Sequence, residues 1–440
     1  MSNQKEKNVI GYMYQSPDVH SYANVFGNLK PWEIDPWQEV SLSWKESSYI
    51  HTGISNFGIR LKGADALDFL RYASINKVDN WKINRGKHMV FCDEEGLIAA
   101  HSLVNRIDKD EFIMYATNPL QIFKLIKEKE YNMEMTMPDF FIFQMSGPLS
   151  LTIIEKASGQ DLHDVKFLEN RKVDWLELGI EVEIQRIGMS GTLAYEVKGE
   201  GKHGPEVYDA LYEAGKPLGL KRLGWRTYML NHTEGGYPQG NGSFAYSVDY
   251  DPKLTPGDGE SNNIGSVDPK DFRARMRTPY EVDWGWMVDF DKGDFVGKEA
   301  LEKERDNPKR KIVTLKWNVD DIVDIYRSLY EKDEEPYKYM EYPIGYLQPN
   351  GGNADRVLDK EGNLIGISSI VAYSNFYRET ISQCIMDIDK IEEGKEVIVQ
   401  WGDYGHRIKE VRAEIVRYPY STLIENKDYD LSTVPKGTEV

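Results

Sequence analysis

Reactive side chains are concentrated in residues 224–237, which read G-W-R-T-Y-M-L-N-H-T-E-G-G-Y. This stretch contains a fixed cation (Arg226), two phenols that can donate a proton (Tyr228 and Tyr237), an imidazole (His232) and a carboxylate (Glu234). The glycines after Glu234 allow the backbone to turn or to approach a ligand closely. The residue types alone fit the end of a helix followed by a polar loop equally well.

Two further stretches carry polar side chains within apolar surroundings. Glu196 lies at the end of the apolar run L-A-Y-E-V, which is typical of a strand. Gln144 lies in the strand-like run F-F-I-F-Q-M-S, and Gly-Pro follows at once. This glutamine is a candidate recognition amide, although a glutamine on the outer face of a strand explains it as well.

Length and composition fit a globular protein of several domains. A chain of 440 residues is too long for one core, so two or three domains are expected. Hydrophobic residues make up 40% of the chain, yet no apolar run is long enough to span a bilayer. The first residues, M-S-N-Q-K-E-K-N, lack the apolar core of a signal peptide. Together these features predict a cytoplasmic location.

Charge and cysteine content argue against several classes of function. The formal net charge is −18 and no dense Lys/Arg stripe is present, so the chain does not suit nucleic-acid binding. The acidic residues are spread along the chain and mainly favour solubility. Cys92 and Cys384 lie far apart and suggest neither a disulfide framework nor a metal cluster. We therefore expect no nucleic-acid, membrane or metal partner, and the oligomeric state stays open.

Hydrophobic patterns predict an α+β region followed by an all-β region. A strand at 51–61, a helix at 64–72 and a meander of hairpins over 88–115 open the chain. Strands and helices alternate from there to residue 215. Strand-like runs separated by turns then predict a C-terminal β-barrel, and they lie at 312–317, 364–371, 380–388 and 397–401.

Two polar stretches are expected to connect these regions. Residues 243–271, rich in Gly, Pro, Asn and Asp, predict a long surface excursion or a flexible lid. Residues 303–311, charged and containing Pro308, predict an interdomain linker. The expected domains are 1–305, with an inserted subdomain at about 56–139, and 306–440 for the barrel.

Three stretches together resemble the glycine-cleavage T-protein family of folate-dependent enzymes. Residues 278–301 are similar to its P-x-E, G-W and K-G-D-F-x-G-K-E-A-L signature, and residues 186–197 to its R-x-G-Y-T-G-E-x-G-(F/Y)-E-(I/L). The resemblance covers nearly the whole chain. It implies a multi-domain T-protein-like folate-binding fold of the α+β class with a C-terminal β-barrel, and tetrahydrofolate as the methyl acceptor.

The resemblance also implies which side chains hold the pteridine ring of tetrahydrofolate. The ring presents an N–H and an exocyclic amine side by side, and a carboxylate can accept both in a charge-assisted contact. Glu196 matches the family's pteridine carboxylate. Gln144 would bond another edge of the ring, and Tyr237 would stack on it.

Two departures from the T-protein argue against aminomethyl transfer. Ala100 and His101 stand where the T-protein carries an Asp-Asp pair. Arg226 and Glu234 are eight residues apart rather than six, and this longer form resembles the tetrahydrofolate-dependent O-demethylases of vanillate and syringate. An early Tyr-x-Tyr that ends at Tyr14 matches the same branch.

This branch implies transfer of a methyl group from a methoxylated aromatic compound to N5 of tetrahydrofolate. A phenolate is a poor leaving group, so a positioned proton donor should help. Tyr228 matches the tyrosine with that role and is the expected donor, while Tyr14 matches a second pocket tyrosine that would orient the substrate. A phenol with a pKa of about 10 is protonated at neutral pH and can donate a proton.

The expected substrate site differs from the vanillate branch at two positions. Asn56 replaces a pocket histidine, and Thr117 replaces the arginine that holds the substrate carboxylate. A benzoate would then need another cation, for which His101 and His232 are candidates, or the substrate is not a benzoate. Demethylation at sulfur or nitrogen stays open. A non-catalytic folate-binding assembly factor is disfavoured, because Asp294 stands where that branch carries a cysteine.

Overall fold

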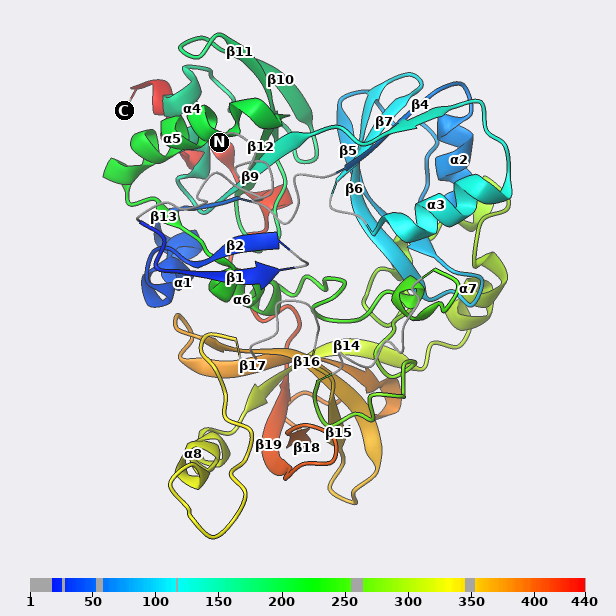
Figure 1. The fold of residues 1–440 in the computed structure, drawn as a ribbon, viewed down its shortest axis with the longest axis vertical. Helices are drawn as coiled ribbons and strands as arrows, with labels where there is room; N and C mark the ends of the chain where they lie inside the picture. The colour runs from blue at the N-terminus through cyan, green and yellow to red at the C-terminus, as the bar shows by residue number, and fades with distance from the viewer. Residues whose placement is uncertain are drawn as a thin grey trace, which may run out of the picture.

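The computed structural model describes residues 18–25, 28–52, 58–115, 118–254, 264–344 and 353–439. A six-stranded sheet, a five-stranded sheet and a closed barrel form three lobes around the centre of the molecule (Figure 1). Within these ranges no helix is long and apolar enough to cross a membrane. Three expected site residues, Tyr14, Asn56 and Thr117, lie outside the described residues.

The six-stranded sheet has the order β10-β11-β12-β9-β3-β13. Its strands are β3 (Tyr49–His51), β9 (Phe140–Ser146), β10 (Asn170–Trp175), β11 (Ile180–Gln185), β12 (Ala194–Glu200) and β13 (Lys221–Arg222). One face packs with α4 (Ser150–Ser158) and α5 (Gly204–Gly215). Phe143 and Val197 join that core. Since side chains alternate along a strand, Gln144 and Glu196 lie on the opposite face.

The five-stranded sheet has the order β5-β6-β7-β4-β8 and packs with α2 (Ala66–Ala73) and α3 (Pro119–Glu128). Its strands are β4 (Gly58–Lys62), β5 (Arg85–Cys92), β6 (Ile98–Asp108), β7 (Glu111–Tyr115) and β8 (Glu134–Thr136). The single strand expected at 51–61 is wrong, because β3 and β4 belong to different sheets. An alternating pattern does not distinguish one long strand from two short ones.

The two sheets meet through the face of β9 that carries Gln144. Ile142 packs with Leu103 of β6, and the rings of Phe140 and Tyr115 lie edge to face with centroids 5.1 Å apart. An interface of this kind leaves polar side chains on β9 and β12 between the sheets rather than in water. The sheet–sheet contact therefore determines where the expected folate residues lie.

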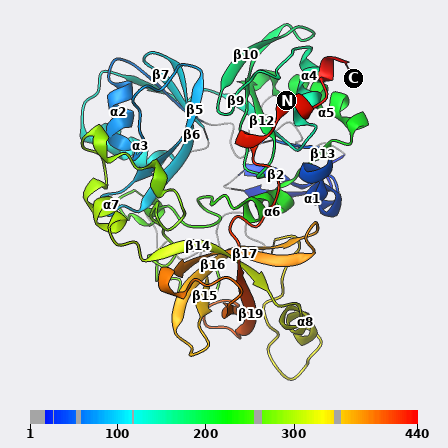
Figure 2. The ribbon, with the colours of Figure 1, turned by 180° about the vertical axis from the view of Figure 1, so that it is seen from behind.

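The barrel closes in the order β14-β17-β16-β15-β18-β19, as expected for the C-terminal region. Its strands are β14 (Arg310–Trp317), β15 (Asp355–Leu358), β16 (Leu364–Ser374), β17 (Glu379–Asp387), β18 (Glu396–Trp401) and β19 (Lys409–Val416), and α8 (Val319–Ser328) stands beside them (Figure 2). Beyond β19 the chain returns to the six-stranded sheet, where Leu431 and Val434 join its core. The range 306–440 thus includes a tail that packs outside the barrel.

Both stretches expected to be connections are more ordered than their composition suggests. Residues 303–311 contain the end of α7 (Lys298–Arg305) and the start of β14, so they are not a free linker. In the stretch 243–271, Phe244 and Tyr246 are buried in a core with Trp284. The expected lid is therefore wrong for this part, because its aromatic side chains are buried; residues 255–263 lie outside the described ranges.

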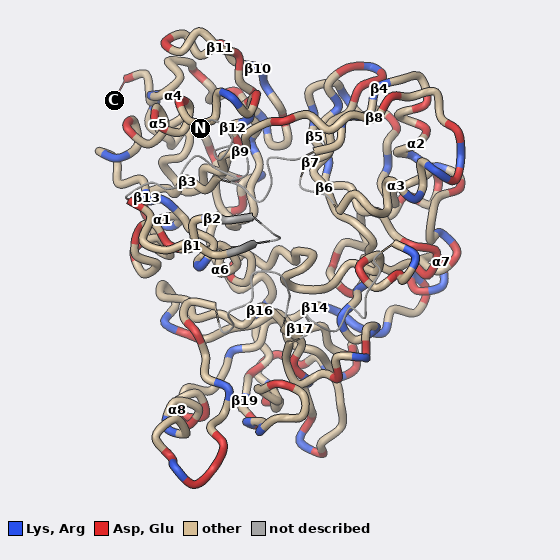
Figure 3. The backbone as a smooth tube through the Cα atoms, in the orientation of Figure 1, with Lys and Arg blue, Asp and Glu red and all other residues tan. Residues whose placement is uncertain are grey.

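Helix α6 (Trp225–Gly235) contains most of the reactive stretch and lies between the six-stranded sheet and the barrel (Figure 1). It packs with β1 (Ser21–Val25), β2 (Asn28–Glu33) and α1 (Trp37–Glu46) on one side and with β16 on the other. Basic and acidic residues are interspersed along the outer loops of all three lobes (Figure 3). This distribution fits a role of the net charge in solubility.

Candidate active site

The two charged residues of α6, Arg226 and Glu234, connect the helix to its neighbours. Glu234 is buried, accepts a hydrogen bond of 2.6 Å from Ser374 of the barrel and pairs with Lys45 of α1. Arg226 forms an ion pair of 2.7 Å with Glu33 of β2. These contacts hold α6 against α1, β2 and the barrel.

The glycines after Glu234 are required by chain packing. Gly236 has φ 66° and ends the helix in the left-handed region. A Cβ on Gly235 would lie 3.1 Å from the carbonyl oxygen of Met189 and 3.2 Å from the nitrogen of Gly191. These glycines therefore allow the end of α6 to pack closely against the loop at 188–192.

Tyr228 and His232 lie one turn apart on the remaining face of α6, with ring centroids 5.0 Å apart. Tyr228 is fully buried and stacks on His51 of β3 at a centroid distance of 4.6 Å. Its hydroxyl makes no hydrogen bond of normal geometry within the described chain, although the side chain of Gln144 lies near enough to affect its pKa. Burial raises the pKa of Tyr228 well above its usual value, so the phenol stays protonated.

A row of polar side chains crosses the six-stranded sheet next to Tyr228. The register places His51 opposite Gln144, Gln144 opposite Glu196, and Glu196 opposite Gln185. The Gln144 amide donates to Glu196 at 3.4 Å, and Lys198 pairs with the second Glu196 oxygen at 2.8 Å. The two residues expected to hydrogen-bond the pteridine, Gln144 and Glu196, thus lie side by side, and Glu196 is only 7% exposed.

Tyr237 follows α6 and reaches the five-stranded sheet through its hydroxyl. Its Oη lies 2.9 Å from Nδ1 of His88 on β5 and 3.3 Å from Nε2 of His101 on β6. The two imidazole nitrogens are themselves 3.2 Å apart. The ring of Trp284 packs on His101 at a centroid distance of 4.7 Å. We call the hydroxyl of Tyr237 with the imidazoles of His88 and His101 the phenol–imidazole triangle.

All four histidines around α6 are neutral near pH 7. Burial lowers the pKa of His51 to about 3 and the pKa of His88 and of His232 to about 4. The pKa of His101 is also lowered, well below its usual value, by burial and then by the charge of His88. His101 and His232 can therefore meet a substrate as hydrogen-bonding groups, but neither supplies a cation for a carboxylate.

These histidines predict that acid destabilises the protein. In the unfolded chain these histidines bind protons near pH 6.5, but in the folded chain they do so only near pH 4. The free energy of unfolding therefore keeps its full value above pH 6.5 and falls as the pH is lowered toward about 4. Each such histidine contributes a slope of about 1.4 kcal/mol per pH unit. Urea unfolding between pH 7.5 and 5 should show this loss, with a shallower slope in His232→Gln. An unchanged slope in that variant would mean that folding does not lower the pKa of His232.

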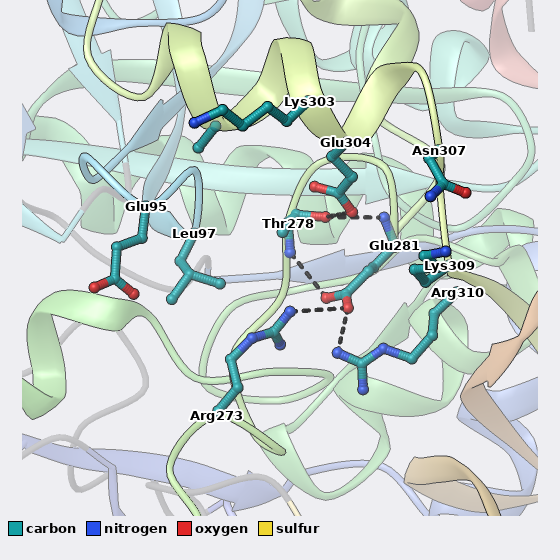
Figure 4. Close-up of a pocket in the computed structure, with 11 residues that line it drawn as sticks. Glu95, Leu97, Arg273, Thr278, Glu281, Lys303, Glu304, Asn307, Lys309 and Arg310 are labelled. Carbon is teal, nitrogen blue, oxygen red and sulfur yellow. Dashed lines mark hydrogen bonds and ion pairs between the residues drawn. The ribbon is translucent and has the colours of Figure 1, made fainter.

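A surface pocket lies apart from α6, where α7 meets β14 (Figure 4). Glu281 of the 278–301 signature lies between Arg273, at 3.1 Å, and Arg310, and it accepts from the backbone N–H of Thr278 at 3.0 Å. Thr278 in turn donates to Glu304 at 2.7 Å. These groups are bonded to one another and join the signature to the barrel. We therefore place the candidate site at α6.

Sequence reasoning placed Gln144, Glu196, Tyr228, His232, Tyr237 and His101 in the site, and the structure brings these six residues to one region. It missed His51, His88, Lys198 and Trp284. A signal for His88 existed, because the hairpin turn at 94–96 places it diagonal to His101 across β5 and β6. His51 and Trp284 come from other elements and carry no local signal.

Comparisons with known proteins identify the family. The GCVT N-terminal domain model matches residues 47–260. A sesamin methylene transferase of Sinomonas sp. is 36% identical over 94% of this chain and 95% of that protein, and a syringate O-demethylase of Sphingobium sp. is 26% identical over 91% of each. An aminomethyltransferase of Thermoanaerobacter sp. is 26% identical over 74% of this chain and 85% of that protein.

A solved structure supports the same fold. The glycine cleavage system aminomethyltransferase T from Bartonella henselae superposes with a TM-score of 0.69 at 15% identity, covering 93% of this chain and 96% of that chain. At this identity the likeness concerns the fold, which includes the closed barrel. The chain therefore belongs to the GCVT family of enzymes, whose members use tetrahydrofolate to accept or carry a one-carbon group.

Proposed function

We propose that this enzyme transfers a methyl group from an ether oxygen of a methoxylated aromatic compound to N5 of tetrahydrofolate and releases the phenol. The observation that carries this proposal is the position of the buried Tyr228 hydroxyl, next to the row that contains Gln144 and Glu196. A proton donor beside a pteridine site is what displacement of a phenolate requires.

The residues present fit tetrahydrofolate. A carboxylate offers about four acceptor positions, so Glu196 retains acceptor capacity after its contacts with Gln144 and Lys198. Glu196 would accept from the paired N–H groups of the pteridine, Gln144 would bond a neighbouring edge, and the ring of Tyr237 would stack on it. Bound tetrahydrofolate would supply N5 as the nucleophile.

The chain's own residues would protonate the leaving group and keep water out. As the C–O bond breaks, its electron pair goes to the aryl oxygen, which takes a proton from Tyr228. The stacked ring of His51 holds the Tyr228 ring in place, and burial of both rings excludes water from that proton. Tyr14 would orient the donor. The proton that N5 would release on accepting the methyl group restores Tyr228, so the donor exchanges its methyl group for a hydrogen and no oxidant is needed.

Transfer of a methylene group is a second candidate. It is favoured by the 36% identity to a protein named for methylene transfer, against 26% to the syringate enzyme. The donor would then carry a carbon bridging two aryl oxygens, and both oxygens would leave as a catechol. The neutral histidines fit either donor better than they fit a benzoate, since His101 and His232 provide no cation.

A paired donor panel tests the proposal. The enzyme is incubated without oxygen with tetrahydrofolate and matched methoxy, methylenedioxy, methylthio and N-methyl aromatic compounds, and the folates are separated by mass. We expect 5-methyltetrahydrofolate from the methoxy donors. Formation of 5,10-methylenetetrahydrofolate from methylenedioxy donors alone would establish the second candidate. Turnover only of the sulfur or nitrogen donors would contradict both.

A further inference from the structure

We propose that His88 and His101 are positioning residues that fix the ring of Tyr237 through its hydroxyl and thereby set the affinity for the pteridine ring. This role differs from the substrate contact expected for His101. The inference rests on the proposed folate site, but it does not depend on which one-carbon donor the enzyme uses.

The donors and acceptors of the phenol–imidazole triangle determine what the Tyr237 hydroxyl can bind. A neutral imidazole has one donor and one acceptor nitrogen, and a phenol donates one hydrogen bond and accepts others. One imidazole N–H can donate to the Tyr237 oxygen while the Tyr237 O–H donates to the other imidazole, at the observed 2.9 and 3.3 Å. In either direction the phenol proton is used inside the protein. Tyr237 then offers a ligand its ring rather than its proton.

Other contacts hold Tyr237 at its backbone and at the side of its ring. The His232 Nδ1–H donates to the backbone oxygen of Tyr237 at 3.0 Å, which fixes the main chain just beyond α6. Trp284 lies beside both Tyr237 and His101, with centroids 6.0 and 4.7 Å away. With its hydroxyl bonded to β5 and β6, the ring bridges the five-stranded sheet and α6.

A ring fixed before the ligand arrives lowers the cost of binding, because less side-chain freedom is lost on association. Removing any one member of the triangle should free the ring and weaken stacking. Removing a second member should then add little, because the ring is already free. Non-additivity is thus the signature of positioning through Tyr237.

A double-mutant cycle tests this inference through folate affinity. The dissociation constant of tetrahydrofolate is measured by calorimetry without oxygen for wild type, His88→Phe, Tyr237→Phe and the double variant. Each single change should weaken binding by about tenfold, and the double variant should be no weaker than the weaker single variant. His101→Gln, which keeps an N–H donor, should retain more affinity than His101→Phe. His406→Gln, at an exposed histidine, is the matched control.

The outcomes separate the inference from the proposed function. Unchanged affinity in the single variants, or losses that multiply in the double variant, would overturn the positioning role while folate binding by the wild type stands. A wild type that does not bind tetrahydrofolate would overturn the proposed function itself. Urea unfolding of each variant identifies losses that come from instability, and His101→Gln with His101→Phe decides the question if the double variant fails to fold.

Discussion

Replacing Tyr228 by phenylalanine should lower turnover of the aryl ether by about 10²–10⁴-fold, because a positioned acid contributes that much to displacement of a poor leaving group. Folate affinity should stay nearly unchanged, since the ring that stacks on His51 remains and only the hydroxyl is lost. The rate should be measured under single-turnover conditions, with the folate dissociation constant measured separately. The loss should shrink for donors whose phenol product is more acidic, because they need less protonation.

Tyr14→Phe is the companion variant for this test, since two phenols in one site could share the role. If Tyr228 is the donor and Tyr14 orients the substrate, Tyr14→Phe should mainly raise KM. A much larger loss of turnover in Tyr14→Phe across several methoxyphenols would reverse the two roles. Equal turnover of Tyr228→Phe and wild type would leave Tyr228 as a packing residue only.

Removing the Glu196 carboxylate should weaken tetrahydrofolate binding by about 30- to 150-fold. Loss of a charged acceptor at a buried site costs on the order of 2–3 kcal/mol, and every 1.4 kcal/mol is about tenfold in affinity. Glu196→Ala and the isosteric Glu196→Gln should both show the loss in calorimetry. The matched control is Glu200→Ala, at an exposed glutamate on the same strand.

Removal of Glu196 also leaves Lys198 buried without its carboxylate, so part of the loss could come from local rearrangement. The double change Glu196→Gln with Lys198→Met removes both charges. If Glu196 binds the pteridine directly, this double variant should regain stability against urea without regaining folate affinity. Recovery of affinity together with stability would assign Glu196 a structural role.

The sequence pattern is sufficient to place residues that lie on regular strands, although their roles in the site stay predictions. Strand alternation places Gln144 and Glu196 on one face of β9 and β12, and the motif at 186–197 is enough to identify Glu196 as the expected pteridine carboxylate. The closed barrel also follows from short strand runs separated by turns. Two barrel strands, β15 and β19, were not predicted. Strand β15 is short and β19 is strongly charged, so the hydrophobic pattern that indicates a strand is weak in both.

What could not be predicted depends on contacts between distant segments. The sequence of α6 does not show that Glu234 and Arg226 pair with Lys45 and Glu33 while Tyr228 faces the sheet. Which side chains of α6 form ion pairs and which face the sheet depends on the elements that pack against each face of the helix. The triangle likewise needs β5, β6 and the end of α6 to meet. The polar composition of residues 243–271 led to the wrong prediction of a lid around Phe244. Burial of this one aromatic side chain holds the segment against the core despite its polar neighbours.

Transfer of the ether carbon is tested most directly with a donor labelled with carbon-13 at the methoxy carbon and, in parallel, at a methylenedioxy carbon. The enzyme, tetrahydrofolate and donor are mixed without oxygen, and the label is followed by NMR spectroscopy through one turnover. We expect the labelled resonance to move to a folate carbon as an equal amount of phenol or catechol appears. Label released as free formaldehyde or methanol, with tetrahydrofolate bound but unchanged, would contradict it.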